Sequence, residues 1–217
     1  MKKYSVAIFD FDGVIANSES IRLNTYKILF KDKFNIDIEF DEKSLIGNSE
    51  NSNLIYLLDK YNLNSNIESL KNLRKKLLTK EKTKIQLNFI IKDIIEKLFS
   101  LKIPLFVASS SSRKYIVDLL EKFDLLNKFT GIFTSDDVIK KKPDPEIYLK
   151  IKNNYKYFYK NILVFEDSPI GVSAAKDPKI DCVAVLSSFT IKDLNKADFF
   201  INLDEYDKVN SIIKLFR

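Results

Sequence analysis

From residue 89 onward the sequence alternates short apolar runs with stretches of helical spacing, and this alternation restricts the fold more than any other feature. The runs are rich in β-branched and aromatic residues, which is typical of strands buried on both faces. Between them apolar residues recur three and four positions apart, as from Ile91 to Leu98 and from Ile116 to Phe123. The pattern predicts an α/β fold with a Rossmann-like parallel sheet flanked by helices. The predicted strands are residues 4–9, 104–109, 131–134, 161–166, 182–186 and 198–202.

The gap between the first and second apolar runs is too long for a simple crossover. It spans roughly 90 residues, whereas a strand–helix–strand unit needs only a few tens. The gap contains apolar residues at helical spacing with Lys and Glu on the other face, and it shows no convincing strand. We therefore predict a small helical cap domain at residues 15–86, inserted after the first strand of a core formed by 1–14 and 87–217. The predicted cap helices are residues 18–30, 53–61 and 70–84.

Composition excludes several kinds of chemistry. The chain of 217 residues contains no histidine, so catalytic Ser-His-Asp or Cys-His groups and His-ligated zinc are impossible. The single cysteine, Cys182, cannot form an internal disulfide and suits a reducing compartment. The net charge is +6, but only four of the 36 basic residues are Arg, and the Lys are spread along the chain. Proteins that bind nucleic acid usually cluster their cations and favour Arg, so we expect no nucleic-acid partner.

The N-terminal apolar run does not indicate export or membrane insertion. It ends at Asp10, too early for a signal-peptide core of about 7–15 residues. Nowhere do the roughly 18 uninterrupted apolar residues of a membrane span occur. We expect a cytoplasmic monomer without a membrane partner.

Acidic residues follow two of the predicted strands. Asp10 and Asp12 come at the end of the first, and Glu166 and Asp167 at the end of a later one. Ligands of an open parallel sheet bind beyond the carboxyl ends of its strands, so these side chains should converge. Residues two apart on an extended segment point the same way, which would aim Asp10 and Asp12 at one spot. Together with Asp167 they would form a hard-oxygen site suited to Mg²⁺.

Ser109, at the end of the second strand, and Lys142, after the third, add a hydroxyl and a point charge. These groups are suited to binding phosphoryl oxygens. In this arrangement Asp10 would attack phosphorus, since carboxylates act as covalent nucleophiles. Asp12 would protonate the leaving oxygen and then deprotonate the water that clears the aspartyl phosphate.

Each of these groups also has a purely structural explanation when taken alone. Acidic pairs at strand ends are often solvated turns, and Glu166 with Asp167 could cap the helix that follows. Ser109 belongs to a run of four serines and Lys142 to a run of three lysines. Their occurrence together, each at the end of a strand, favours a functional site.

Four sequence segments resemble the four motifs of the haloacid dehalogenase superfamily. They are FDFDGV (9–14), VASSS (107–111), KKPDPEIY (141–148) and FEDSPIGVSAA (165–175). The helical insertion after the first motif resembles that of the subgroup containing β-phosphoglucomutase, phosphoglycolate phosphatase and sugar-phosphate phosphatases.

The resemblance implies roles for the acidic residues. Asp10 would be the nucleophile, and Asp12 the acid/base whose backbone carbonyl also binds Mg²⁺. Asp167 would be a metal ligand with Glu166 beside it. For the other positions, the resemblance implies phosphoryl binding by Ser109 and Lys142, and we expect the neighbouring Ser110 to take part. We expect substrate selection by the cap residues Arg22, Gly47, Asn48 and Glu50.

The residue at position 12 restricts the reaction that the resemblance implies. An Asp there argues against the dehalogenases and phosphonatases of the superfamily, which lack it. We therefore expect a Mg²⁺-dependent phosphatase acting on a small phosphorylated metabolite of the sugar or polyol phosphate class. The alternatives are a hexose-phosphate mutase and a catalytically idle binding protein. Glu50 occupies the place of the arginine of β-phosphoglucomutase, and we expect its negative charge to oppose the second phosphate that a mutase must bind.

Overall fold

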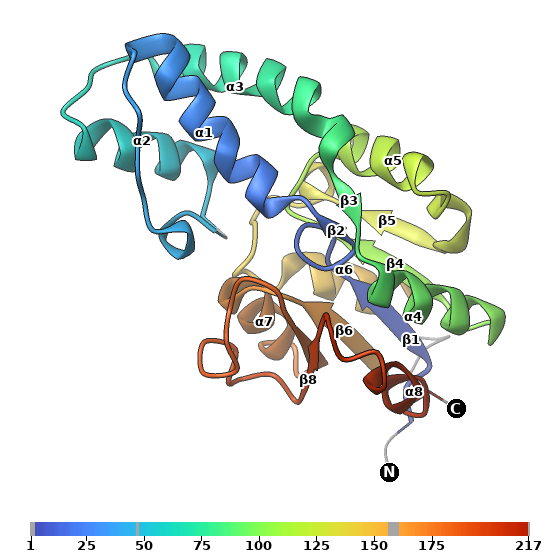
Figure 1. Cartoon of the computed structure of the whole chain (residues 1–217). Helices are drawn as coiled ribbons and strands as arrows, with labels where there is room; N and C mark the ends of the chain where they lie inside the picture. Colours follow the sequence, from blue (N-terminus) through green and yellow to red (C-terminus); the bar gives the residue numbers. More distant parts are fainter. Residues whose placement is uncertain (1–2, 47, 156–160, 217) are drawn as a thin grey trace. The chain divides into compact units, whose positions relative to one another are not determined.

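The structure is a computed structural model that describes residues 3–46, 48–155 and 161–216. It divides into two compact units, one formed by Met1–Ala16 and Leu87–Arg217 and the other by Asn17–Gln86 (Figure 1). We call the first the core unit and the second the helical unit.

The described residues of the core unit form a six-stranded parallel sheet of order β5-β4-β1-β6-β7-β8. β1 is central, and its four residues are fully buried, as expected for a strand covered on both faces. The chain first extends the sheet on one side of β1 and then on the other, so the strand order reverses at β1, where ligands bind in folds of this kind. The predicted Rossmann-like sheet is thus confirmed. The strands are β1 (Val6–Phe9), β4 (Leu105–Ala108), β5 (Gly131–Phe133), β6 (Ile162–Glu166), β7 (Asp181–Leu186) and β8 (Phe199–Asn202).

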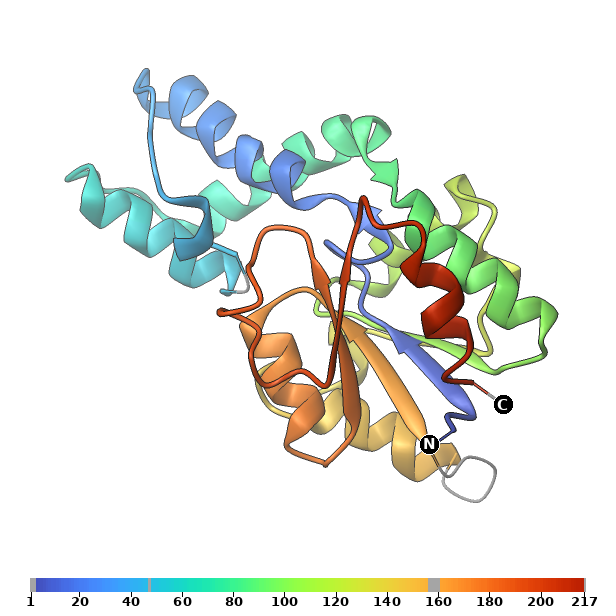
Figure 2. The ribbon, with the colours of Figure 1, turned by 60° about the horizontal axis from the view of Figure 1, so that its bottom comes forward.

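Helices cover both faces of this sheet. α4 packs with α8 on one face, and α6 packs with α7 on the other (Figure 2). Helix α4 shows why the apolar spacing was informative, because Ile91, Ile94, Ile95 and Leu98 are all fully buried. The helices of the core unit are α4 (Phe89–Ser100), α5 (Arg113–Lys122), η3 (Leu126–Lys128), η4 (Ser135–Asp137), α6 (Glu146–Tyr155), α7 (Pro169–Lys176) and α8 (Lys208–Ile213).

The helical unit has an apolar core of its own. Leu54, Leu57 and Leu70 are fully buried there with Phe30, and each such side chain contributes about 1.5–3 kcal/mol through burial. α2 begins where the Ser49 side chain accepts from the backbone N–H of Ser52, a standard N-cap. The helices are α1 (Glu19–Phe34), η1 (Glu42–Ser44), α2 (Glu50–Lys60), α3 (Ile67–Glu81) and η2 (Lys82–Lys84).

The expectation of no strand within residues 15–86 was wrong at the two ends of that segment. β2 (Ala16–Asn17) and β3 (Gln86–Leu87) form a two-stranded sheet where the chain passes between the two units. Two residues are too few to show an alternating pattern, so the sequence could not reveal these strands.

Candidate active site

Asp10 lies immediately after β1, at the carboxyl edge of the sheet. Its backbone N–H donates to the carbonyl of Phe165 at 2.9 Å, which joins it to the end of β6. The residue is almost fully buried, at 8% exposed. Burial raises the pKa of Asp10, and the neighbouring ammonium of Lys142 opposes that rise.

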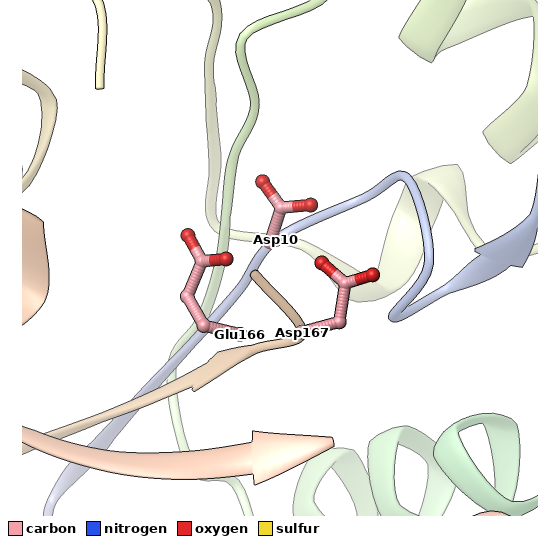
Figure 3. Close-up of side chains that lie close together, drawn as sticks. All are labelled: Asp10, Glu166 and Asp167. Carbon is pink, nitrogen blue, oxygen red and sulfur yellow. The ribbon is translucent and has the colours of Figure 1, made fainter. Parts of the chain in front are cut away.

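Glu166 and Asp167 occupy the end of β6 and the residue that follows it. One oxygen from each of Asp10, Glu166 and Asp167 lies within 4.8 Å of the others, and all three residues are buried. Figure 3 shows the three carboxyl groups gathered around one small region. Carboxylate oxygens are the ligands preferred by hard divalent cations, so these residues could hold a metal ion.

Lys142 links two of these carboxylates. Its ammonium donates to Asp10 Oδ1 at 2.6 Å, to Glu166 Oε1 at 2.6 Å and to the carbonyl of Ala108 at 2.8 Å. All three of its donors are therefore used within the core unit. Burial lowers the pKa of Lys142, but the carboxylates of Asp10 and Glu166 outweigh this effect and raise it, so the lysine stays charged.

Two glycines make room for the carboxylates. A Cβ at Gly13 would lie 1.8 Å from Asp167 Oδ2, and a Cβ at Gly171 would lie 2.0 Å from Glu166 Oε2. Gly13 also has φ of +82°, a conformation that side chains rarely adopt. Both carboxylates occupy space that any other residue at 13 or 171 would fill.

The Asp12 carboxylate does not join the group formed by Asp10, Glu166 and Asp167. Its two oxygens accept from the hydroxyls of Ser111, at 2.6 Å, and Tyr115, at 3.3 Å. Strand alternation, on which the expectation that Asp10 and Asp12 converge was based, does not apply here. β1 ends at Phe9, and Asp12 instead makes an isolated bridge with Ala16, so the alternation of an extended strand does not reach it.

The two serines predicted to bind phosphate differ in their environment. Ser109 is buried directly after β4, and its hydroxyl accepts from the backbone N–H of Ser111 at 3.1 Å. Ser110 is exposed. Both follow the strand next to β1, on the same edge of the sheet as Asp10.

Sequence reasoning missed four side chains that contact the acidic residues. Ser187, after β7, donates to Asp167 Oδ2 at 3.0 Å, and its place at a strand end was a usable signal. Ser111 and Tyr148 lie inside quoted motifs but were given no role, and Tyr115 lies on α5 beyond them. The Tyr148 hydroxyl donates to Glu166 Oε1. Burial and the Glu166 carboxylate raise the pKa of Tyr148, so it remains a protonated donor.

The residues predicted to select the substrate belong to the helical unit, and one of them, Gly47, lies outside the described residues. Glu50, at the start of α2, accepts from Arg74 Nη1 at 2.7 Å. Arg74 also donates to the backbone carbonyl of Arg22 at 3.0 Å. Asn48 is exposed and donates from its side chain to the carbonyl of Ser44 at 2.8 Å.

The ion pair changes the expectation for Glu50. The negative charge of Glu50 was expected to oppose a second phosphate, but the guanidinium of Arg74 compensates that charge within the same unit. Arg74 lies about two turns inside α3 and far from Glu50 in the sequence, so the pairing carried no local signal. The charge at position 50 therefore does not by itself separate a phosphatase from a mutase.

A parallel sheet with a buried carboxylate cluster at its switch point defines an α/β enzyme site built on oxygen ligands. Residues 7–185 match the family model described as haloacid dehalogenase-like hydrolase. The chain belongs to this family and is a hydrolase, as the four motifs predicted.

Individual relatives agree with this assignment. The chain is 27% identical to a phosphorylated carbohydrates phosphatase of Thermotoga maritima, over 80% of this chain and 81% of that protein. It is 31% identical to the validoxylamine A 7′-phosphate phosphatase of Streptomyces hygroscopicus subsp. limoneus, over 50% of this chain and 51% of that protein. The crystal structure of β-phosphoglucomutase from Clostridium difficile has the same fold, with a TM-score of 0.75 at 22% identity, covering 97% and 99% of the two chains.

Within the residues that the structure describes, no helix is both long enough and apolar enough to span a membrane.

Proposed function

We propose that this protein is a Mg²⁺-dependent phosphatase that hydrolyses a small sugar or polyol phosphate through an aspartyl phosphate on Asp10. The observation that carries the proposal is the position of the Asp10 carboxylate. It is buried at the edge of the sheet, with Lys142 on one oxygen and two further carboxylates within 4.8 Å. A buried carboxylate next to a fixed cation and a potential metal site is suited to attack on a phosphate ester.

The donor set fits Mg²⁺, because Asp10, Glu166 and Asp167 offer three hard oxygen ligands and Lys142 balances only part of their charge. Following the resemblance, the backbone carbonyl of Asp12 would complete the protein ligands. The bound ion would neutralise carboxylate charge and polarise a phosphoryl oxygen.

In the first half-reaction, a carboxylate oxygen of Asp10 forms a bond to phosphorus, and the bond from phosphorus to the ester oxygen breaks. Asp12 gives its proton to that leaving oxygen. In the second half-reaction, Asp12 takes a proton from water, which attacks phosphorus and releases inorganic phosphate from Asp10. Ser111 and Tyr115 hold Asp12 for both steps. Ser109, Ser110 and Lys142 would bind the phosphoryl oxygens.

Two relatives support hydrolysis of a phosphorylated carbohydrate or a similar polyol. One is named for phosphorylated carbohydrates and the other for a phosphate ester of validoxylamine A, and both are named phosphatases. The similarity to β-phosphoglucomutase supports only the shared fold, because the identity is 22%. These relatives favour a phosphatase over a hexose-phosphate mutase.

The helical unit is the part of the chain that we assign to substrate selection. It has its own apolar core, as an independent cap domain requires. Within it, Arg22, Asn48 and Glu50 would contact the substrate, together with Gly47. The enzyme would act as a cytoplasmic monomer on a free metabolite. The buried thiol of Cys182, which needs no oxidising compartment, supports that location.

A screen for phosphate release tests the proposal. The wild-type protein and Asp10→Asn are incubated with Mg²⁺ and a panel of phosphorylated sugars, polyols and other small metabolites. We expect release from some sugar or polyol phosphates by the wild type and none by the variant, which lacks the attacking charge but keeps the shape. Activity of Asp10→Asn within about tenfold of the wild type would contradict the covalent mechanism.

A second assay separates hydrolysis from mutation. β-Glucose 1-phosphate is supplied with a bisphosphate primer, and inorganic phosphate and glucose 6-phosphate are both measured. A phosphatase releases phosphate without forming glucose 6-phosphate. Primer-dependent glucose 6-phosphate formed faster than phosphate would establish the mutase instead.

A further inference from the structure

Tyr148 is a fully buried tyrosine on α6, within hydrogen-bond reach of the acidic cluster. Its side chain is 0% exposed, and its hydroxyl donates to Glu166 Oε1. Lys142 donates to the same oxygen at 2.6 Å, and its ammonium lies 5.1 Å from the centre of the Tyr148 ring. Two donors, one from the loop before α6 and one from α6 itself, therefore meet on one oxygen of a carboxylate that could bind a metal.

This arrangement treats the two oxygens of Glu166 differently. Oε1 receives both hydrogen bonds. The whole carboxyl group lies in the space left by the missing Cβ of Gly171, at 2.0 Å from that position for Oε2 and 2.4 Å for Oε1. A carboxylate with two donors on one oxygen cannot exchange its oxygens by rotation without breaking both bonds. The donors thus fix which oxygen of Glu166 is left for another ligand.

Lys142 alone would fix this orientation poorly. Its ammonium is shared among Asp10, Glu166 and the carbonyl of Ala108, and it sits on a flexible four-carbon stem. The tyrosine ring, in contrast, is enclosed on every side, and its hydroxyl position follows from the packing of α6. The rigid donor is therefore Tyr148.

We infer that Tyr148 is a positioning residue for the metal site, whose hydroxyl holds the Glu166 carboxylate in the orientation that binds Mg²⁺. The inference rests on the proposed function for the presence of Mg²⁺, but it concerns the affinity of the site and not the reaction. A partner of this kind typically changes metal affinity about 10–100-fold when it is removed.

Calorimetric titration of Mg²⁺ without substrate tests the inference. Tyr148→Phe removes the hydroxyl and keeps the ring, and Tyr155→Phe on the same helix, whose ring packs against Phe106, is the matched control. We expect Tyr148→Phe to bind Mg²⁺ at least about tenfold more weakly than the wild type. We expect Tyr155→Phe to bind it with wild-type affinity. Where phosphate release is measurable, Tyr148→Phe should need more Mg²⁺ and recover most of kcat at saturation.

Other results would overturn the inference. One is a Mg²⁺ affinity of Tyr148→Phe within twofold of the wild type. Another is an equal loss of Mg²⁺ affinity in Tyr148→Phe and Tyr155→Phe, and a third is a wild type that binds no Mg²⁺. Mg²⁺ binding that follows the expected pattern in a protein that releases no phosphate would instead reject the proposed function and leave the role of Tyr148 intact.

A second measurement does not need Tyr148→Phe to fold. Tyrosines are replaced by 3-fluorotyrosine, and fluorine NMR spectra are recorded during a Mg²⁺ titration. Tyr115, whose hydroxyl reaches Asp12, would also respond, so labelled Tyr115→Phe provides the background. In labelled Tyr115→Phe we expect one fluorine resonance to shift strongly during the titration. The midpoint of that shift should equal the midpoint of Mg²⁺ binding. The absence of any such resonance would overturn the inference.

Discussion

Lys142 determines the charge balance of the site. It contacts two of the three clustered carboxylates directly, and removing one partner of a buried ion pair costs about 3–5 kcal/mol. With Asp10, Glu166 and Asp167 ionised, one lysine leaves two negative charges uncompensated in a buried volume. A divalent cation would balance those two charges.

Asp12 should be distinguishable from Asp10 by its dependence on the leaving group. As a general acid it assists departure of a poor leaving group and is dispensable for a good one. We expect Asp12→Asn to lose about 10²–10⁴ in rate with alkyl phosphates and much less with p-nitrophenyl phosphate. Steady-state kinetics on both substrates measure the difference.

Ser111 provides the control for this effect. Ser111→Ala removes the 2.6 Å hydrogen bond to Asp12 but keeps the carboxyl group, so it should show the same selectivity between substrates to a smaller degree. Equal losses of Asp12→Asn on the two substrates would show that Asp12 is not the acid.

The residues of the site differ in how far the sequence could reveal them. Asp10, Glu166 and Asp167 follow apolar runs directly, and the switch-point rule is sufficient to bring them together. Asp12 could not be placed, because its position depends on how the chain turns after β1. Tyr148 reads as an ordinary core residue of α6, since its ring is buried and only its hydroxyl has a polar role.

At the level of elements, the helical unit contains a buried cation that joins its helices. Arg74 on α3 is 3% exposed, pairs with Glu50 on α2 and stacks 3.8 Å from the ring centre of Tyr26 on α1. Glu50, in contrast, is 34% exposed. Removing Glu50 therefore leaves a buried charge unpaired, whereas removing Arg74 leaves a charge that is partly exposed to water.

This asymmetry predicts unequal stability losses. Glu50→Gln leaves a buried guanidinium without a counter-charge, and such a loss approaches about 3–5 kcal/mol. Arg74→Met leaves a carboxylate that water can reach, so we expect a loss at least about 1 kcal/mol smaller. Urea unfolding measures both, with Lys71→Met, at a partly exposed position of α3, as control. A larger loss in Arg74→Met would contradict the explanation.

The loop between β5 and α6 is held by a different carboxylate. Glu146 accepts from the backbone N–H groups of Ile139 and Lys140 at 2.8–3.1 Å and lies 3.1 Å from Lys150. The backbone donors, more than the lysine, lower the pKa of Glu146 to about 2. Lys142 lies two residues beyond Lys140, so the same contact helps to fix the segment that carries Lys142.

The lowered pKa of Glu146 gives this contact a defined pH dependence. Its contribution to stability should be complete above about pH 4.5, the ordinary pKa of Glu, and be lost as pH falls toward about 2. Glu146→Gln lacks the titrating group. We therefore expect the wild type to melt higher than Glu146→Gln at pH 6 and the two curves to converge between about pH 4 and 2. A difference that stays constant over that range would contradict this assignment.

For the molecule as a whole, Mg²⁺ should act as a stabilising ligand of the folded state. A ligand at 100 times its Kd stabilises by about 2.7 kcal/mol, which for a chain of this size raises Tm by about 5–10 °C. We expect the shift to vanish with excess chelator and in Asp167→Asn. Differential scanning fluorimetry with extrinsic dye measures it. An unchanged Tm at Mg²⁺ concentrations that support turnover would exclude the carboxylate cluster as the binding site.

The core sheet could be predicted from the sequence, but the two short strands β2 and β3 could not. Buried parallel strands produce continuous apolar runs, and helices between them produce a different period, so the core sheet could be predicted. The two short strands at Ala16–Asn17 and Gln86–Leu87 are held by pairing across about 70 residues of sequence, and no local pattern predicts them.

Gly13 and Gly171 also mark two positions at which we expect no substitution to be tolerated. Every missense change in a glycine codon introduces a residue with at least a Cβ, and at these two positions that atom would collide with Asp167 or Glu166. No replacement there is conservative, however small the new side chain. A saturation library scored for turnover should therefore show both codons as fully intolerant. Tolerance to mutation should therefore be low at these two glycines, although neither has a side chain.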